Sequence, residues 1–362
     1  MRFRASITNI NTFTKFTASL STLGNIAWLR LDERDVRFTV IPEKGSQVWS
    51  VLSIYAIFET YTIQSAAENN TINLEVPLAP LQRALKSAQN AIGANIRLTK
   101  KNNIPLLSLT ITTTTMNSAG FQSTAFSQRD SGQDHDPSAP PDGTEDYQFT
   151  EQNLDLTNRN AERETLVTQD IPVRVLAAAS VEGLHEPRCR EPDVHITLPN
   201  LLQLKSISDR FTRLALSTSK SARSGFTNSS SGPKLELSAN MHGCLRLALK
   251  TDSMNINSLW TGLDNPELDP EHVAEGATGV DNHPSTRMKQ MGDSQGQSEE
   301  GWATVRVEGK DWGKVLSVGR LGGRVIACFC HDHALILYVF LGEEESGGGE
   351  SVLTYYISSY SA

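Results

Sequence analysis

Four times along this chain, a short run of alternating apolar and polar residues passes almost directly into an amphipathic helical pattern. The four units are "RFRASI" into "TNINTFTKFTASLSTLG", "INLEV" into "PLAPLQRALKSAQNAIG", "DVHITL" into "PNLLQLKSISDRFTRLAL", and "ATVRV" into "EGKDWGKVLSVGRLGG". A period of two indicates a half-buried strand, and a period of 3.6 indicates a helix with one buried face. Two units lie in each half of the chain, and further strand-like runs follow every helix. The repeat therefore predicts an α+β fold of two similar domains, each with two helices packed on one face of mainly antiparallel strands.

The second unit, residues 77–93, shows the helical pattern most clearly. At 100° per residue, its apolar residues fall on one arc, which contains Leu81, Ala84, Leu85, Ala88, Ala91 and Ile92. The opposite arc contains Arg83 and Lys86 and no acid. Pro80 suits the first turn of a helix and Gly93 suits a C-terminal cap, so both ends agree with the period.

The four predicted helices are basic although the chain has a net charge of -8. Together they hold nine Lys or Arg against three acids, Asp209, Glu308 and Asp311. If these helices share one face, that face would attract phosphates by counterion release without reading bases. Exposed cations that only keep a helix soluble would give the same pattern, and charge alone leaves both explanations open. The DNA-facing candidates are Lys15, Arg83, Lys86, Lys205, Arg210, Arg213, Lys310, Lys314 and Arg320.

Three stretches lose the hydrophobic period, namely residues 113–165, 218–233 and 262–300. They are rich in Ser, Gly, Pro or acidic residues, so we expect disordered insertions that cannot offset their ordering entropy. The rest of the 362 residues suffices for two domains of common size. We also expect an intracellular protein, because there are four cysteines, no long apolar run and no apolar stretch at the start.

Several segments together resemble the Hus-one family of checkpoint clamp subunits. They are "MRFRASI", "SAAENNTINLEV", "LQRALKSAQNA", "IRLTKKNNIPLLSLTI", "VTQDIPVRVL" and "EPDVHITLPNLLQLKSISDRF", in this order. The resemblance implies the fold of proliferating cell nuclear antigen, a ring with inner helices around DNA and outer antiparallel sheets. It also implies a nuclear heterotrimer with Rad-nine and Rad-one type subunits, loaded at damaged DNA by a Rad-seventeen replication-factor-C-type ATPase. Such a ring would promote checkpoint signalling and recruit repair enzymes, with no membrane and no cofactor involved.

The same resemblance divides the chain into residues 1–176, an interdomain connector at 177–192 beside which partners dock, and residues 193–362. Clamp subunits join through strand edges, and Pro172 independently favours an edge strand because proline cannot donate to a ladder. The interface candidates are therefore Asp170, Ile171, Pro172, Val173, Arg174 and Val175, with Leu245, Arg246, Leu247, Ala248, Leu249 and Lys250 in the second domain. Without the resemblance, an edge merely guarded by proline and charge explains "DIPVRV" equally well.

A different class of function is suggested by "CFCHDH", residues 328–333. Cys328, Cys330, His331 and His333 are metal-ligand types, and a metal- or cysteine-dependent enzyme is the alternative to a clamp. The run reads as a hairpin turn between two strands, however, and so short a run closes a tetrahedral site poorly. "GRLGG" lacks the Lys-Ser/Thr of a phosphate loop, and neither "GxSxG" nor "HExxH" occurs. We therefore expect a noncatalytic protein. A third possibility is a scaffold protein of the same fold that does not bind DNA phosphates.

Overall fold

The computed structural model describes residues 1–115, 163–222, 232–268, 276–341 and 351–360. The first half contains strands β1 to β10 and the helices between them: β1 Arg2–Ile7, α1 Ile10–Ser21, β2 Ile26–Leu31, β3 Asp35–Val40, β4 Gln47–Ser53, α2 Ile54–Ile57, β5 Phe58–Gln64, η1 Glu68–Asn70, β6 Ile72–Pro77, α3 Leu78–Ser87, β7 Gly93–Lys101, β8 Ile104–Thr115, β9 Arg163–Pro172 and β10 Arg174–Val175. The short helix α4, Ala178–Val181, follows β10.

The second half repeats most of this order of elements, without counterparts of β5 and β10 in its described part. It contains β11 Val194–Thr197, α5 Leu201–Ala222, β12 Lys234–Ala239, β13 Leu245–Thr251, β14 Met254–Trp260, α6 Gly276–Asn282, α7 Pro284–Lys289, β15 Ala303–Glu308, α8 Gly309–Val315, η4 Leu316–Leu321, β16 Val325–Cys330, β17 Ala334–Leu341 and β18 Ser351–Ser358. Among the described residues, no helix is long and apolar enough to cross a membrane.

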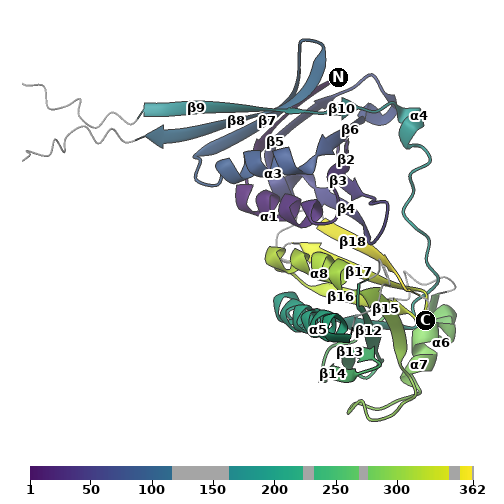
Figure 1. Cartoon of the computed structure of the whole chain (residues 1–362). Coiled ribbons are helices and arrows are strands. Elements are labelled where there is room, and N and C mark those ends of the chain that lie inside the picture. The colour runs from purple at the N-terminus through teal and green to yellow at the C-terminus, as the bar shows by residue number, and fades with distance from the viewer. Residues whose placement is uncertain (116–162, 223–231, 269–275, 342–350, 361–362) are drawn as a thin grey trace, which may run out of the picture.

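Within the described residues the strands form three antiparallel sheets (Figure 1). The five-stranded sheet has the order β5-β1-β7-β8-β9, and the four-stranded sheet has the order β14-β13-β12-β15. The nine-stranded sheet, β10-β6-β2-β3-β4-β18-β17-β16-β11, runs through both halves because β4 pairs with β18. In this junction Ser50 lies opposite Leu353 and Val48 lies opposite Tyr355.

Each described strand of the second half has a counterpart in the first half, which contains β5 and β10 in addition. The series β1-β7-β8-β9 matches β11-β16-β17-β18, and the series β6-β2-β3-β4 matches β15-β12-β13-β14. Ala5 and Ile196 hold the same place in their strands, because a helix begins five residues after each, at Ile10 and at Leu201. The predicted α+β repeat of two similar units is confirmed. The predicted connector, 177–192, lies between β10 and β11, and the domain boundaries drawn on either side of it stay predictions.

The helices bury their apolar stripes against the sheets as their period requires. In the first half, the rings of Phe16 and Phe38 meet edge to face with centroids 5.2 Å apart, a favoured aromatic geometry. In the second half, Trp312 is fully buried, and its Nε1 donates a hydrogen bond to Ser208 Oγ at 3.2 Å. This bond satisfies the polar atom of the ring, which would otherwise be costly to bury.

Two predicted helices end earlier than expected. Helix α3 stops at Ser87, and Gly93 is the first residue of β7 rather than a helix cap. The reason is the neighbouring sheet, since the backbone N–H of Ile92 donates to the carbonyl of Thr112 on β8. Ile92 is consequently 64% exposed instead of buried. The fourth helix tightens after Val315 into the 3-10 helix η4.

The expectation of disorder across 262–300 is wrong for much of that segment. Helices α6 and α7 form within it, and His283 caps α7 by accepting from the N–H of Ser285, with Pro284 in the first turn. The Asp293 carboxylate accepts hydrogen bonds from the N–H groups of Gln295, Gln297 and Ser298. Asp293, which counts as a disorder-promoting residue in the composition, therefore stabilises a turn.

The other two predicted insertions fall largely outside the described residues. Strand β8 continues to Thr115 and β9 begins at Arg163, so residues 113–115 and 163–165 are strand and not loop. Helix α5 extends to Ala222, well into the predicted segment 218–233. Residues 116–162 and 223–231 lie outside the described part of the chain.

Candidate nucleic-acid interface

The four helical units of the repeat lie side by side in one layer. Helix α1 contacts α3 and η4, and α5 contacts both α8 and η4. Figure 1 shows α3, α1, α8 and α5 one below another along one side of the molecule. Within the first half, Ser21 Oγ donates to Gln82 Oε1 at 3.1 Å and ties α1 to α3.

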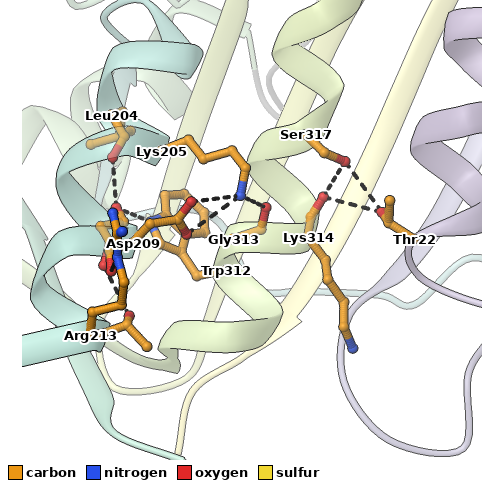
Figure 2. Close-up of polar contacts among 11 residues, drawn as sticks. Thr22, Leu204, Lys205, Asp209, Arg213, Trp312, Gly313, Lys314 and Ser317 are labelled. Carbon is orange, nitrogen blue, oxygen red and sulfur yellow. Dashed lines mark hydrogen bonds and ion pairs between the residues drawn. The ribbon is translucent and has the colours of Figure 1, made fainter. Parts of the chain in front are cut away.

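The layer continues across the boundary between the two halves. Thr22, at the end of α1, hydrogen-bonds through Oγ1 to the carbonyl of Lys314 at 3.4 Å and to Ser317 Oγ at 3.2 Å (Figure 2). Together with the β4–β18 pairing, these bonds join the helices of both halves into one surface. The four helical units therefore form one continuous surface, and cations on separate helices lie on it together.

Helix α3 shows why its cations point away from the sheets. Leu81 and Leu85 are 1% and 0% exposed, and the 3.6-residue period places Arg83 and Lys86 on the opposite side, where both are exposed. In the part of the chain that the structure describes, neither side chain forms an ion pair or a hydrogen bond. Both positive charges are therefore available to an anion.

The nine predicted DNA-facing residues fall into two groups. Seven are exposed on the helical layer, and we call them the inner basic face: Lys15, Arg83, Lys86, Arg210, Arg213, Lys310 and Arg320. Of these, Arg213 also donates from Nε to the carbonyl of Asp209 at 3.2 Å, a bond that uses one of its guanidinium donors. The other two, Lys205 and Lys314, are only half exposed.

Lys205 is engaged within the protein instead of standing free on the surface. Its Nζ donates to the carbonyl of Gly313 at 2.8 Å and lies 3.1 Å from Asp209 Oδ2 (Figure 2). This contact covers a carbonyl near the C-terminal end of α8, where a positive charge is favourable. Lys314 Nζ similarly lies 2.9 Å from Asp311 Oδ1. These neighbouring acids offset both charges, so we leave the two lysines out of the inner basic face.

The first predicted interface segment, "DIPVRV", is split between two sheets. Asp170, Ile171 and Pro172 end β9, which is the outer strand of the five-stranded sheet. Arg174 and Val175 form β10 at an edge of the nine-stranded sheet, and Arg174 pairs with Glu75 at 3.4 Å. Val173 between them is buried. Both strands are edges, as the proline indicated.

The second predicted interface strand, 245–250, is not an edge. Leu245, Arg246, Leu247, Ala248, Leu249 and Lys250 lie in β13, which pairs with β12 on one side and with β14 on the other. Its backbone groups are thus taken up within the sheet, whose two end strands among the described residues are β14 and β15. Sequence reasoning missed "MNINSLW" because polar Ser258 on the inner side and apolar Leu259 on the outer side interrupt the period of two that runs through Met254, Ile256 and Trp260.

The segment "CFCHDH" does not gather its side chains into one site. Cys328 and Cys330 are buried on β16, while His331 and His333 are exposed at the turn before β17. His331 Nδ1 already accepts the N–H of Thr304. Burial raises the pKa of Cys328 to about 12 and that of Cys330 to about 11, which disfavours the thiolate needed for metal binding or attack. Among the described residues, no group of three or more His, Cys, Asp or Glu could hold a metal.

Comparisons with known proteins agree with this geometry. The sequence profile of the family described as Hus1-like protein matches residues 1–361. The checkpoint protein hus1 of Schizosaccharomyces pombe is 36% identical over 361 residues, covering 99% of both chains. The human checkpoint protein HUS1 is 25% identical over 282 residues, covering 76% of this chain and 79% of its own.

Solved structures show the same fold at low sequence identity. Proliferating cellular nuclear antigen from Entamoeba histolytica superposes with a TM-score of 0.57 at 13% identity and covers 99% of both chains. PCNA from Thermococcus kodakaraensis gives a TM-score of 0.56 at 12% identity, covering 99% of this chain and all of its own. The architecture is thus that of PCNA clamps, and the whole-length match shows that this chain belongs to the Hus1-like protein family.

Proposed function

We propose that this chain is a noncatalytic subunit of a checkpoint sliding clamp that encircles duplex DNA and touches its phosphates through the inner basic face. The observation that carries the proposal is the family match over residues 1–361, joined to a single helical layer with seven exposed cations. Contacts to phosphates alone hold a protein on DNA without fixing it at one sequence. Such contacts suit a ring that slides.

The internal repeat supports a way for such a ring to close. Strand β18 is the counterpart of β9, and β4 is the counterpart of β14, so the β4–β18 junction inside the chain is a template for a β14–β9 junction between subunits. Within the described residues, β9 and β14 are each paired on one side only. Open strand edges are ready to pair with another chain.

The partners follow from the family resemblance. We propose two further clamp-like subunits, of the Rad-nine and Rad-one types, and a Rad-seventeen replication-factor-C-type loader. The assembled ring would act in the nucleus at damaged DNA, promote checkpoint signalling, and recruit repair enzymes beside the connector at 177–192. The solved structure described as a PCNA2-PCNA3 complex, from Sulfolobus tokodaii, is an example of two different chains of this fold in one assembly.

Copurification from the native source tests the assembly. A tagged full-length chain should elute as a stable complex with two other proteins in equal amounts, and mass spectrometry should identify both as clamp-like. A chain that elutes alone or as a homotrimer would contradict the proposal. Salt-dependent DNA affinity of the complete complex separates the clamp from a scaffold of the same fold that ignores phosphates.

A further inference from the structure

A second basic surface lies on the outer face of the five-stranded sheet, away from the helices. On β1, Phe3, Ala5 and Ile7 are buried in the core, whereas Arg2 and Arg4 alternate with them and are exposed. On β7, Ala94 and Ile96 are buried, and Arg97 and Lys101 belong to the exposed alternate set. Successive side chains of a strand point to opposite faces, so these four cations share the outer face. We call Arg2, Arg4, Arg97 and Lys101 the outer basic patch.

The centre of the outer basic patch places two like charges side by side. Arg4 lies directly opposite Arg97 in the antiparallel register of β1 and β7. Like charges in this position destabilise a sheet. Within the described residues, neither guanidinium has an ion pair or a side-chain hydrogen bond. Of the acids on this sheet, Asp170 is two strands away from Arg97, with Ser108 between them, and Glu59 lies at the bulge of the β1–β5 pair, opposite neither arginine.

Protection of a sheet edge does not explain these arginines. Cations often guard an edge strand against pairing with another chain. Here, however, β1 lies between β5 and β7, and β7 lies between β1 and β8, so both are interior strands. The sheet also separates the patch from the inner basic face, so DNA held by the helices does not neutralise it. A local conflict of this kind, kept at a cost in stability, is typical of a binding surface.

We propose that the outer basic patch binds an extended acidic peptide that carries phosphorylated side chains. The guanidinium group offers a planar fork of donors that matches a phosphate or carboxylate with two hydrogen bonds. Alternate residues of an extended peptide recur about every 7 Å, which is also the spacing of Arg2 and Arg4 along β1. Exposed hydroxyls on β5, at Thr60 and Thr62, lie opposite Ser6 and Arg4 and supply further donors.

The chemistry of the face favours a peptide over a nucleic acid. Single strands are held by aromatic side chains on which the bases stack. On the described strands of this sheet, most outer positions around the patch are Thr, Ser, Asn and Gln, with the aliphatic Ile104 and Leu106 opposite Lys101 and Thr99. The aromatic residues Phe3, Phe58 and Tyr61 lie on the other face or inside. Four cations can neutralise at most about four phosphates, fewer than the roughly 6–10 contacts of a strongly salt-dependent duplex binder.

Fluorescence anisotropy with a defined probe tests the proposal. The probe is a twelve-residue peptide with phosphoserine at alternate positions, and its unphosphorylated form is the comparison. We expect the full-length chain and the complete complex to bind the phosphorylated probe, and Arg97→Glu to weaken binding at least about tenfold. The thermal midpoint of that variant should stay equal or rise, because the new carboxylate lies opposite Arg4. If Arg97→Glu loses probe binding while its stability is unchanged or greater, the loss is due to the missing arginine contact and not to misfolding.

Two matched variants complete the experiment. Arg34→Glu reverses an exposed arginine in the turn between β2 and β3 and should leave probe binding unchanged. The double reversal of Arg83 and Lys86 to Glu should also leave it unchanged, since these residues lie on the helical layer. The proposal is overturned if the probe does not bind, or if all three variants weaken it equally. It is also overturned if Arg97→Glu reduces affinity for an oligonucleotide and not for the phosphopeptide.

Discussion

At the scale of single residues, two cations of the predicted DNA-facing set differ in what surrounds them. Arg83 is exposed on α3, whereas Lys205 Nζ is held by the carbonyl of Gly313 and the Asp209 carboxylate. We predict that Arg83→Gln lowers the salt dependence of DNA binding by roughly one counterion and leaves stability unchanged. Lys205→Gln should leave the salt slope nearly unchanged and cost about 1 kcal/mol of stability, because it removes a charged hydrogen bond.

Salt titrations of DNA affinity and urea unfolding of the two variants measure both effects. Equal loss of DNA affinity in Lys205→Gln and Arg83→Gln would show that Lys205 leaves Gly313 to reach DNA. The period of 3.6 residues was enough to place Arg83, because it depends on one helix alone. The contact of Lys205 depends on α8 packing against α5, more than a hundred residues away, and no local pattern shows it.

A buried histidine gives the second half a dependence on pH. His195 on β11 is 5% exposed, and its Nε2 lies 2.7 Å from the carbonyl of Pro266. Burial lowers the pKa of His195, and a second buried histidine, His283, has a lowered pKa for the same reason. His195 faces His283 and Lys289, while Glu191 and Asp193 face His283. The hydrogen bond to the Pro266 carbonyl partly opposes this lowering of the pKa of His195, whereas Lys289, and His283 once it is protonated, add to it.

The direction in which pH changes the stability of the protein follows from the linkage between proton binding and folding. The unfolded chain binds protons at the ordinary histidine pKa of 6.5, while the folded chain resists them until a lower pH. Stability is therefore complete above 6.5 and falls as the pH drops below it. We predict that thermal midpoints decrease from pH 7.5 to 5 and that His195→Gln flattens this decrease. An identical slope in that variant and the parent would assign the dependence to other groups.

At the scale of elements, the internal β4–β18 junction predicts the behaviour of the open edge at β9. Leu353 on β18 is fully buried in that junction, and its counterpart Val167 on β9 is 43% exposed. We predict that Val167→Lys strongly weakens assembly with the partner subunit, because a charge would enter a buried position of the new junction. The isolated chain should keep its stability, since Val167 is exposed there.

Leu166→Lys is the matched control on the same strand. Leu166 lies on the other face of β9, and the residue pair at the corresponding place in the internal junction, Val51 and Val352, stays partly exposed. Size-exclusion chromatography of the coexpressed subunits should show a complex for Leu166→Lys and free subunits for Val167→Lys. If both variants assemble normally, the subunit interface does not include the β9 edge.

The sequence predicted an element correctly where one hydrophobic period ran through it. It failed where contacts with distant parts of the chain determine the structure. The stripe on α1 and the alternation on β1 gave the correct elements, because each buries one regular face. The edge was assigned to β13 in place of β14, since a strand period does not reveal which neighbours a strand has. The ordered helices α6 and α7 were missed because their stability comes from caps and from packing on the second half, which average composition conceals.

At the scale of the whole molecule, the two halves form one continuous body with a helical layer on one side (Figure 1). The net charge of -8 coexists with seven exposed cations on that layer, so the acidic balance describes the remaining surface and loops. The repeat predicted this architecture because each strand-helix unit must bury its apolar face against another. Closure of the proposed ring would depend on partner chains, and periodicity within one chain contains no information about them.

Topological linkage to DNA tests the central claim most directly. The complete complex, loaded with its clamp loader onto a nicked circular plasmid, is passed over a gel-filtration column in high salt, before and after the plasmid is cut once. A ring around DNA predicts that the chain elutes with the circular plasmid and leaves the linear one, because it slides off the ends. Equal retention on both plasmids, or equal loss from both, would contradict the encircling clamp.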